Sequence, residues 1–261
     1  MFDFHMHSGV SFDSKESAGK MVDAAVKAGM KEICFTDHLD YEEIPTGAQL
    51  WFETEDYNAA YDHLQKDGLK IRKGFEFGML PGNRDTFLQD LQRRHFDFVI
   101  GSVHFADGMD IYYKEYWQNR TQEAAETAYF ERVLDCVNTH DSFDVLGHLT
   151  YIGKAANNPC LRAISEREYR ELTDEIFRVL IQKGKGIEVN TSGKDRCGVF
   201  LPDEAYLRRF KELGGEIVTV GSDAHTFDRV GQYCMDACRL VNDIFGYVCT
   251  FEDRKPIFHK L

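Results

Sequence analysis

The chain has 261 residues, of which 43 % are hydrophobic, and its formal net charge is −13 at neutral pH. That length suits one large α/β domain, so we expect residues 1–261 to form a single domain about the size of one (β/α) barrel. No apolar run approaches the about 18 residues of a transmembrane helix, and the N-terminal residues lack the pattern of a signal peptide. The acidic balance, without a basic patch, argues against a nucleic-acid partner. We expect no membrane partner either.

The seven cysteines are scattered along the chain, and no CxxC pair occurs among them. An odd number of dispersed thiols is typical of a reducing compartment rather than of a disulfide framework. We therefore expect a cytoplasmic protein in which most cysteines pack as small apolar groups.

Apolar runs that predict strands alternate with amphipathic patterns that predict helices through the whole chain. The seven predicted strands are Phe2–His5, Glu32–Thr36, Lys70–Phe77, Phe96–Ser102, Phe143–Gly147, Gly186–Asn190 and Glu216–Gly221. Seven strands that alternate with helices predict a parallel α/β sheet, closed into a TIM-like barrel.

The clearest helical patterns are Ala18–Gly29, Thr121–Thr139, Ser165–Lys183 and Pro202–Leu213. Gly29 suits a C-cap, Ser165 followed by Glu168 has the spacing of a capping box, and Pro202 suits a first helical turn. Two long segments interrupt the alternation, Leu39–Tyr57 and Ala106–Arg120, and both are rich in aromatic residues. We expect these loops to shape a pocket at the catalytic face.

Side chains that can bind metal recur where the predicted strands end. In parallel α/β folds these C-terminal ends meet at one edge, where chemistry is done. His5 and His7 have the i, i+2 spacing that lets two imidazoles point the same way. The full set at the strand ends is His5, His7, Asp37, His38, Glu76, His104, His148, Asn190, Asp223 and His225.

A single histidine after a strand is usually an ordinary polar residue, but so many at one edge favour a metal cluster. The donors are imidazoles and carboxylates without thiolates, which favours zinc, iron or manganese. Eight or nine ligands are too many for one ion, so we expect two to three divalent ions, two of them bridged by Glu76. Such clusters hydrolyse phosphoesters and related bonds, because they deprotonate a bound water and stabilise the attacked group.

These motifs, taken together, resemble those of the PHP family, the polymerase and histidinol phosphatase superfamily. The resemblance spans residues 5–225 and implies a distorted seven-stranded (β/α) barrel. The motifs are His5-Met6-His7, Thr36-Asp37-His38, Glu76, His104, His148 and Asp223-Ala224-His225.

The same resemblance implies how the ligands divide into a trinuclear site. His5, His7, Glu76 and Asp223 would hold one ion. A second ion would be held by Glu76, His104 and His148. The third would be held by Asp13, His38 and His225. Asp13 stands six residues after His7, at a position where some branches of the family have a histidine.

The chain length, the Gly101-Ser102-Val103-His104 motif and the aromatic loop after it resemble the histidinol-phosphate phosphatase branch of the family. That branch implies hydrolysis of L-histidinol phosphate to L-histidinol and phosphate, a step of histidine biosynthesis. The substrate would thus be a small phosphomonoester. The oligomeric state is not predicted.

A phosphate dianion also needs cationic partners, and arginine binds phosphate oxygens in a bidentate manner. We expect Arg162, Lys194 and Arg196 to contact the substrate, because they lie in the segments that follow the fifth and sixth predicted strands. The expected mechanism is in-line attack on phosphorus by a hydroxide that bridges two ions. The catalytic residues would be Glu76 as the bridge and Asp223 or His225 as the general acid.

Three alternatives stay open at this point. A phosphoesterase of the same family that acts on a nucleotide or on phosphotyrosine would share every metal motif. An amidohydrolase barrel also begins with HxH, but it usually has a bridging lysine and a lone final aspartate. A non-catalytic metal-binding domain of a replication polymerase would be expected to have lost ligands, whereas this chain retains them all.

Overall fold

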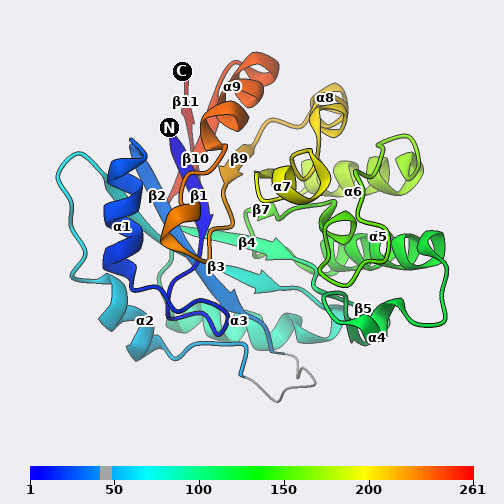
Figure 1. Ribbon diagram of the computed structural model, residues 1–261, viewed down its shortest axis with the longest axis horizontal. Coiled ribbons are helices and arrows are strands. Elements are labelled where there is room, and N and C mark those ends of the chain that lie inside the picture. The colour runs from blue at the N-terminus through cyan, green and yellow to red at the C-terminus, as the bar shows by residue number, and fades with distance from the viewer. Residues whose placement is uncertain (42–48) are drawn as a thin grey trace.

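The central sheet consists of seven parallel strands in the order β1-β2-β3-β4-β7-β8-β9 (Figure 1). The computed structural model describes residues 1–41 and 49–261. The strands are β1 Phe2–Met6, β2 Glu32–Leu39, β3 Lys70–Gly78, β4 Phe98–Ser102, β7 Val145–Leu146, β8 Gly186–Asn190 and β9 Val218–Gly221. The predicted parallel sheet is thus confirmed, and each of these strands overlaps a predicted one.

The sheet is nearly closed into a barrel at the end where the strands finish. Met6 forms a parallel bridge with Ala224. The N–H of His7 donates to the carbonyl of Ala224 at 2.9 Å, and the N–H of Asp223 donates to the carbonyl of His5 at 2.8 Å. The seam therefore places the first and last metal-binding motifs of the sequence side by side.

Helices surround the sheet (Figure 1), and they are α1 Ala18–Lys27, α2 Thr54–Tyr61, α3 Arg84–Arg93, α4 Lys114–Trp117, α5 Gln122–Thr139, α6 Arg170–Gln182, α7 Gly193–Cys197, α8 Glu204–Glu212 and α9 Cys234–Phe245. Short 3-10 helices are η1 Pro81–Asn83, η2 Tyr151–Gly153 and η3 Phe227–Arg229. Two hairpins complete the fold, β5 Phe105–Ala106 with β6 Met109–Asp110, and β10 Val248–Glu252 with β11 Lys255–His259. None of the helices in the described ranges is long and apolar enough to span a bilayer.

The predicted helix boundaries hold at α1 but shift at α6 and α8. Gly29 follows α1 with a φ of +74°, as expected of a glycine that ends a helix. At α6 the helix begins only at Arg170, although the carboxylate of Glu168 accepts from the N–H of Ser165, which is one of the two bonds of a capping box, and also from Arg162. At α8 the N-cap is Asp203, so Pro202 precedes the cap instead of occupying the first turn.

The strands are buried on both faces, as in other parallel sheets covered by helices. All residues of β1, β2, β4, β8 and β9 are buried, whereas β3 is exposed at its start and buried from Gly74 onward. Functional side chains at the strand ends therefore sit on a rigid core.

Candidate metal centre

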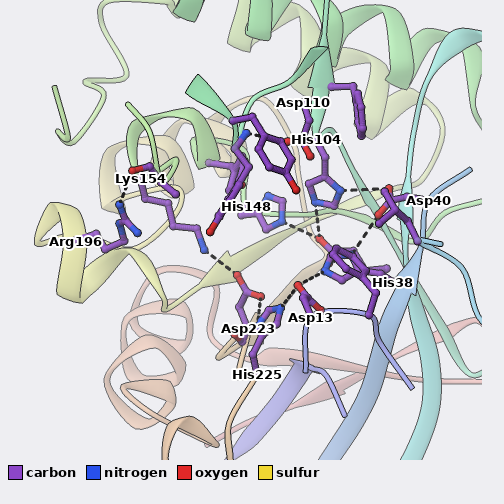
Figure 2. A pocket seen from close by; sticks show the side chains of 18 residues that line it. Asp13, His38, Asp40, His104, Asp110, His148, Lys154, Arg196, Asp223 and His225 are labelled. Carbon is purple, nitrogen blue, oxygen red and sulfur yellow. Dashed lines mark hydrogen bonds and ion pairs between the residues drawn. The ribbon is translucent and has the colours of Figure 1, made fainter. Parts of the chain in front are cut away.

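The predicted metal-binding side chains converge at the C-terminal ends of the strands, beside a cavity of about 500 Å³ (Figure 2). The cavity is lined by members from several strand ends, among them His38, Glu76, His104, His148 and Asp223. His5 and His7 lie beneath them and are fully buried. The structure thus gathers at one point residues that are more than 200 positions apart in the sequence.

The first predicted ligand set converges on one point. The Nε2 atoms of His5 and His7 are 3.1 Å apart. Oε2 of Glu76 lies 3.3 Å from His5 Nε2 and 3.6 Å from His7 Nε2. Oδ1 of Asp223 lies 3.6 and 3.5 Å from the same two nitrogens. Two imidazoles and two carboxylates therefore face a common centre.

The second set uses the other oxygen of Glu76. Its Oε1 lies 2.8 Å from Nε2 of His148 and 3.3 Å from Nε2 of His104. One carboxylate thus divides its two oxygens between two groups of imidazoles, which is the arrangement that a bridging ligand requires.

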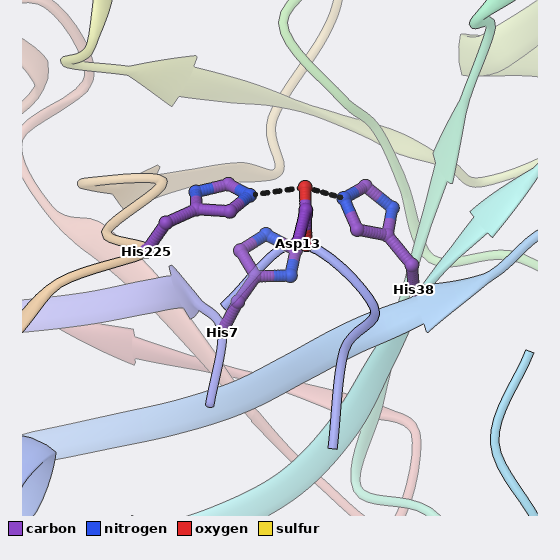
Figure 3. Close-up of side chains that lie close together, drawn as sticks. All are labelled: His7, Asp13, His38 and His225. Atoms are coloured by element: carbon purple, nitrogen blue, oxygen red, sulfur yellow. Dashed lines mark hydrogen bonds and ion pairs between the residues drawn. The ribbon is translucent and has the colours of Figure 1, made fainter. Parts of the chain in front are cut away.

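The third set surrounds a single oxygen of Asp13 (Figure 3). Oδ2 of Asp13 lies 2.9 Å from Nε2 of His225 and 3.4 Å from Nε2 of His38. The hydroxyl of Ser14 donates to the carbonyl of His225 at 2.8 Å, which holds the loop of Asp13 against the last motif. His7 lies close enough to join this group as well.

The electrostatics of the cluster suit a cation. Burial raises the pKa of Glu76, but the charges of His5, His38 and His104 outweigh it and hold that pKa well below its usual range. Burial likewise opposes protonation of His104, yet the carboxylates of Asp40 and Glu76 raise its pKa to about 10. Nearby carboxylates also outweigh burial at His5 and His38 and raise the pKa of both imidazoles, whereas burial and the charge of His225 lower the pKa of His7 to about 3. Donors of this type, this close together, fit zinc, iron or manganese.

Three residues that sequence reasoning missed support the cluster. Glu188 accepts from Nδ1 of His5 at 2.6 Å, and its other oxygen accepts from the N–H of His148 at 2.9 Å. Asp40 lies between His38 and His104. Strand alternation places both carboxylates on the same face as predicted ligands, because Glu188 precedes Asn190 by two positions and Asp40 follows His38 by two.

Close approach of backbone to the cluster requires glycine at Gly221. A Cβ atom there would lie 2.2 Å from the Cβ of His5 and 2.5 Å from Oε1 of Glu188. The absence of a side chain at the end of β9 therefore lets His5 and its carboxylate partner pack against the strand.

The third missed residue is Lys154, a cation at the edge of the cavity (Figure 2). Its Nζ donates to Oδ2 of Asp223 at 2.8 Å, and its side chain is only 12 % exposed. The lysine follows η2, in the loop after β7. No sequence signal separates it from other loop cations.

The three predicted phosphate ligands are placed differently from one another. Arg196 lines the cavity. Arg162 does not, because its guanidinium pairs with the buried Glu126 and with Glu168. Lys194 lies over the ring of Phe200, with its Nζ 4.4 Å from the ring centroid, and lines a separate cavity. Arg162 and Lys194 thus lie away from this cavity, whereas Lys154 and Arg196 line it.

The aromatic side chains of the two long loops are likewise placed differently, some at the cavity and others in the core. Tyr112 and Tyr113 line the cavity, together with Leu50 and Phe105. Tyr116 and Trp117 are instead buried, and each donates a hydrogen bond to a backbone carbonyl, of Ala125 and Ile111 respectively. Phe52 and Tyr57 of the other loop are also buried in the core. Residues 42–48 of that loop lie outside the described residues.

Comparisons with known proteins agree with this geometry. Residues 3–192 match the family model of the PHP domain. A histidinol-phosphatase of Lactococcus lactis is 34 % identical over 233 residues, which cover 87 % of this chain and 85 % of that protein. A probable histidinol-phosphatase of Clostridium acetobutylicum is 29 % identical over 99 % of this chain and 96 % of its own length.

A solved structure is similar over nearly the whole chain. It is the crystal structure of histidinol phosphate phosphatase from Lactococcus lactis, complexed with zinc, L-histidinol and phosphate. The TM-score is 0.88 at 31 % identity, and the alignment covers 98 % of each chain. Since the family model matches well over half of the sequence, the chain belongs to the PHP domain family.

Proposed function

We propose that this protein is a metal-dependent phosphomonoesterase that hydrolyses L-histidinol phosphate to L-histidinol and phosphate. The observation that carries the proposal is the division of Glu76 between two groups of imidazoles, beside a cavity that also holds Lys154 and Arg196. Relatives that match almost the whole chain are named for this activity, and one of them binds both products and zinc.

The ligand sets proposed for the ions are those that the strand ends bring together. Two to three divalent ions, of zinc, iron or manganese, would be held by His5, His7, Asp13, His38, Glu76, His104, His148, Asp223 and His225. When bound, such ions activate a water for attack on phosphorus and stabilise the charge of the transition state.

Lys154 and Arg196 are proposed to bind the phosphate. Both lie on the same side of the histidine cluster (Figure 2), where they can neutralise the phosphoryl oxygens that face away from it. Arginine offers a planar pair of donors and lysine a compact point charge, so the two residues would fix both the orientation and the charge of the group.

The leaving alkoxide needs a proton, and Asp223 is better placed than His225 to deliver it. Both ring nitrogens of His225 have partners, Nε2 with Asp13 and Nδ1 with the carbonyl of Asp223 at 3.0 Å. Oδ2 of Asp223 faces the cavity beside Lys154. Burial raises the pKa of Asp223, but the charges of Lys154 and His5 outweigh it and hold that pKa well below its usual range. The carboxylate would therefore first take up at this oxygen the proton that the attacking water loses, and then pass it to the leaving alkoxide. Asp223→Asn should impair histidinol phosphate more than 4-nitrophenyl phosphate, whose phenolate leaves without a proton.

The proposal also covers the domain organisation of the enzyme, its substrate class and its location. Residues 1–261 would act as one catalytic unit on a small-molecule substrate. A cytoplasmic location stays a prediction; it accords with seven cysteines that are all free thiols in the structure.

The decisive experiment measures phosphate release from histidinol phosphate by metal-free protein, before and after zinc, iron or manganese is restored. We expect no turnover without metal and recovery with at least one of the three. Nucleotides and phosphotyrosine serve as competing substrates. Preference for either of them, or full activity in demonstrably metal-free protein, would overturn the proposal.

A further inference from the structure

The carboxylate of Asp40 stands between two imidazoles that belong to different proposed metal sites. Its Oδ1 lies 3.3 Å from Nδ1 of His104. Its Oδ2 lies 3.3 Å from Nδ1 of His38. The residue is 2 % exposed and comes directly after β2, and its N–H donates to the carbonyl of Leu50 at 2.9 Å. Both the side chain and the backbone of Asp40 are therefore fixed.

We propose that Asp40 is a positioning residue that couples the second and third metal sites. Each imidazole turns its Nε2 toward a metal-site carboxylate, Glu76 for His104 and Asp13 for His38. A ring that binds metal through Nε2 carries its proton on Nδ1 and needs an acceptor there. Asp40 forms a hydrogen bond with His104 through one oxygen and brings the other within ion-pair distance of His38, so a single carboxylate is placed to orient a ligand of each site. This inference rests on the proposed metal centre.

Glu76 competes for one of these rings only in the absence of metal. Its Oε2 lies 3.2 Å from Nδ1 of His38, similar to the distance from Asp40. The same oxygen, however, faces His5 and His7 at the first site. Once both oxygens of Glu76 serve ions, Asp40 is left as the acceptor for His38 among the described residues.

The backbone of the neighbouring strand is shaped around this carboxylate. A Cβ atom on Gly78, at the end of β3, would lie 1.3 Å from Oδ1 of Asp40. The glycine therefore leaves the space that the carboxylate occupies. It also supplies a second way to displace the carboxylate without replacing Asp40.

Glu188 provides the complementary case at the first site. It orients His5 through Nδ1 at 2.6 Å. Loss of Glu188 should therefore weaken the first ion, whereas loss of Asp40 should weaken the second and third. A residue that merely supports the fold would not divide the ions in this way.

The test is titration of the metal-free full-length protein with zinc alone, with bound metal counted by mass spectrometry and affinities measured against a chromogenic chelator. For Asp40→Ala we expect two ions to bind about 10- to 100-fold more weakly while one keeps its affinity. Asp40→Asn has a single acceptor oxygen, so it should weaken one ion only. Gly78→Ala should reproduce the loss of two, and Glu188→Gln should weaken the remaining one.

Asp110→Asn is the matched control, because this cavity carboxylate accepts from the backbone N–H of Tyr112 at 2.8 Å. It should leave the zinc isotherm unchanged. An unchanged isotherm for Asp40→Ala, an equal loss of all ions, or a fourth ion that disappears alone would each overturn the role of Asp40 while leaving the metal centre intact. Wild-type protein that binds no zinc would instead overturn the proposed function.

Discussion

The strand ends and the loops beyond them face the same cavity, but they hold their side chains in different ways. His5 and His7, at the end of the first strand, are fully buried, and neighbouring residues contact both ring nitrogens of each. Arg196, on a short helix after β8, is exposed, and its guanidinium donates to one backbone carbonyl at 3.5 Å. The strand ends thus form a cluster of side chains that hold one another in place, whereas the loops present single side chains to the cavity.

This difference determines how far the effect of a substitution should extend to other side chains. Removing a member of the cluster leaves buried groups without partners, so the effect spreads to the other ligands. Removing an exposed loop residue such as Arg196 costs the one hydrogen bond that it donates. Substitutions at the two regions should therefore differ in size and in kind.

The largest effect should follow from the loss of a cluster residue. Glu76→Ala or His5→Ala removes a proposed ligand, so each variant should lose at least one ion per chain and nearly all activity. The loss should exceed the about 10- to 100-fold in metal affinity that an outer partner contributes. Metal content and phosphate release should be measured on the same samples. If either variant keeps its full metal content and normal turnover, the substituted residue is not a metal ligand.

The strand ends could be predicted from the sequence because a parallel sheet imposes a simple rule. Each strand finishes at the same edge, and alternate residues share one face. His5, Glu76 and Asp223 were therefore found from their positions alone. The missed carboxylates Asp40 and Glu188 obey the same rule, but carboxylates are too common beside strands to attract attention without coordinates.

The loop residues could not be predicted, because no periodicity fixes where a loop side chain points. Arg162 and Lys154 both follow β7 and look equivalent in the sequence. The buried carboxylate of Glu126 draws Arg162 away from the cavity, while Asp223 holds Lys154 at its edge. Such pairings join residues 36 and 69 positions apart, and they depend on how the elements pack.

A second prediction concerns the pH dependence of the metal-free cluster. Burial lowers the pKa of His104, but the carboxylates of Asp40 and Glu76 outweigh burial and raise this pKa to about 10 in the folded protein. Its contribution to stability is full below about pH 6.5, its unfolded pKa, and is lost as the pH rises through about 10. Melting temperatures of chelated protein should therefore fall from pH 6 to pH 9.

Bound ions take the place of the protons on the imidazoles, so zinc-loaded protein should hold its melting temperature over the same interval. The gap between loaded and chelated samples should thus widen with pH. A gap that is constant from pH 6 to pH 9 would mean that protons and ions do not compete for this cluster.

The third prediction separates the loop cations from one another. Lys154→Ala and Arg196→Ala each remove one proposed charged contact to phosphate, worth about 1.5–3 kcal/mol, or about 10- to 150-fold in kcat/KM. Metal content should not change in Arg196→Ala. Arg162→Ala is the matched control, because the guanidinium of Arg162 forms ion pairs with Glu126 and Glu168. It should lower the melting temperature and leave kcat/KM nearly unchanged. If Arg162→Ala loses as much kcat/KM as Arg196→Ala, Arg162 contacts the phosphate after all.

The smallest effect should come from the aromatic residues that follow β6. Tyr112 and Tyr113 line the cavity, whereas Tyr116 and Trp117 are buried in the core. A ring face beside the cationic substrate contributes about 0.5–2 kcal/mol, or about 2- to 30-fold. Tyr112→Ala should therefore reduce turnover of histidinol phosphate relative to 4-nitrophenyl phosphate by that factor. The two substrates share the phosphoryl group, so the ratio of their turnover isolates recognition of the organic part.

Tyr116→Phe is the comparison, because it removes only the hydroxyl that donates to the carbonyl of Ala125. It should lower stability by about 0.5–1.5 kcal/mol and leave the ratio unchanged. If the ratio changes in Tyr116→Phe but not in Tyr112→Ala, the specificity of the loop lies in how its core is packed, and the contrast between rigid strand ends and single loop contacts fails at this loop.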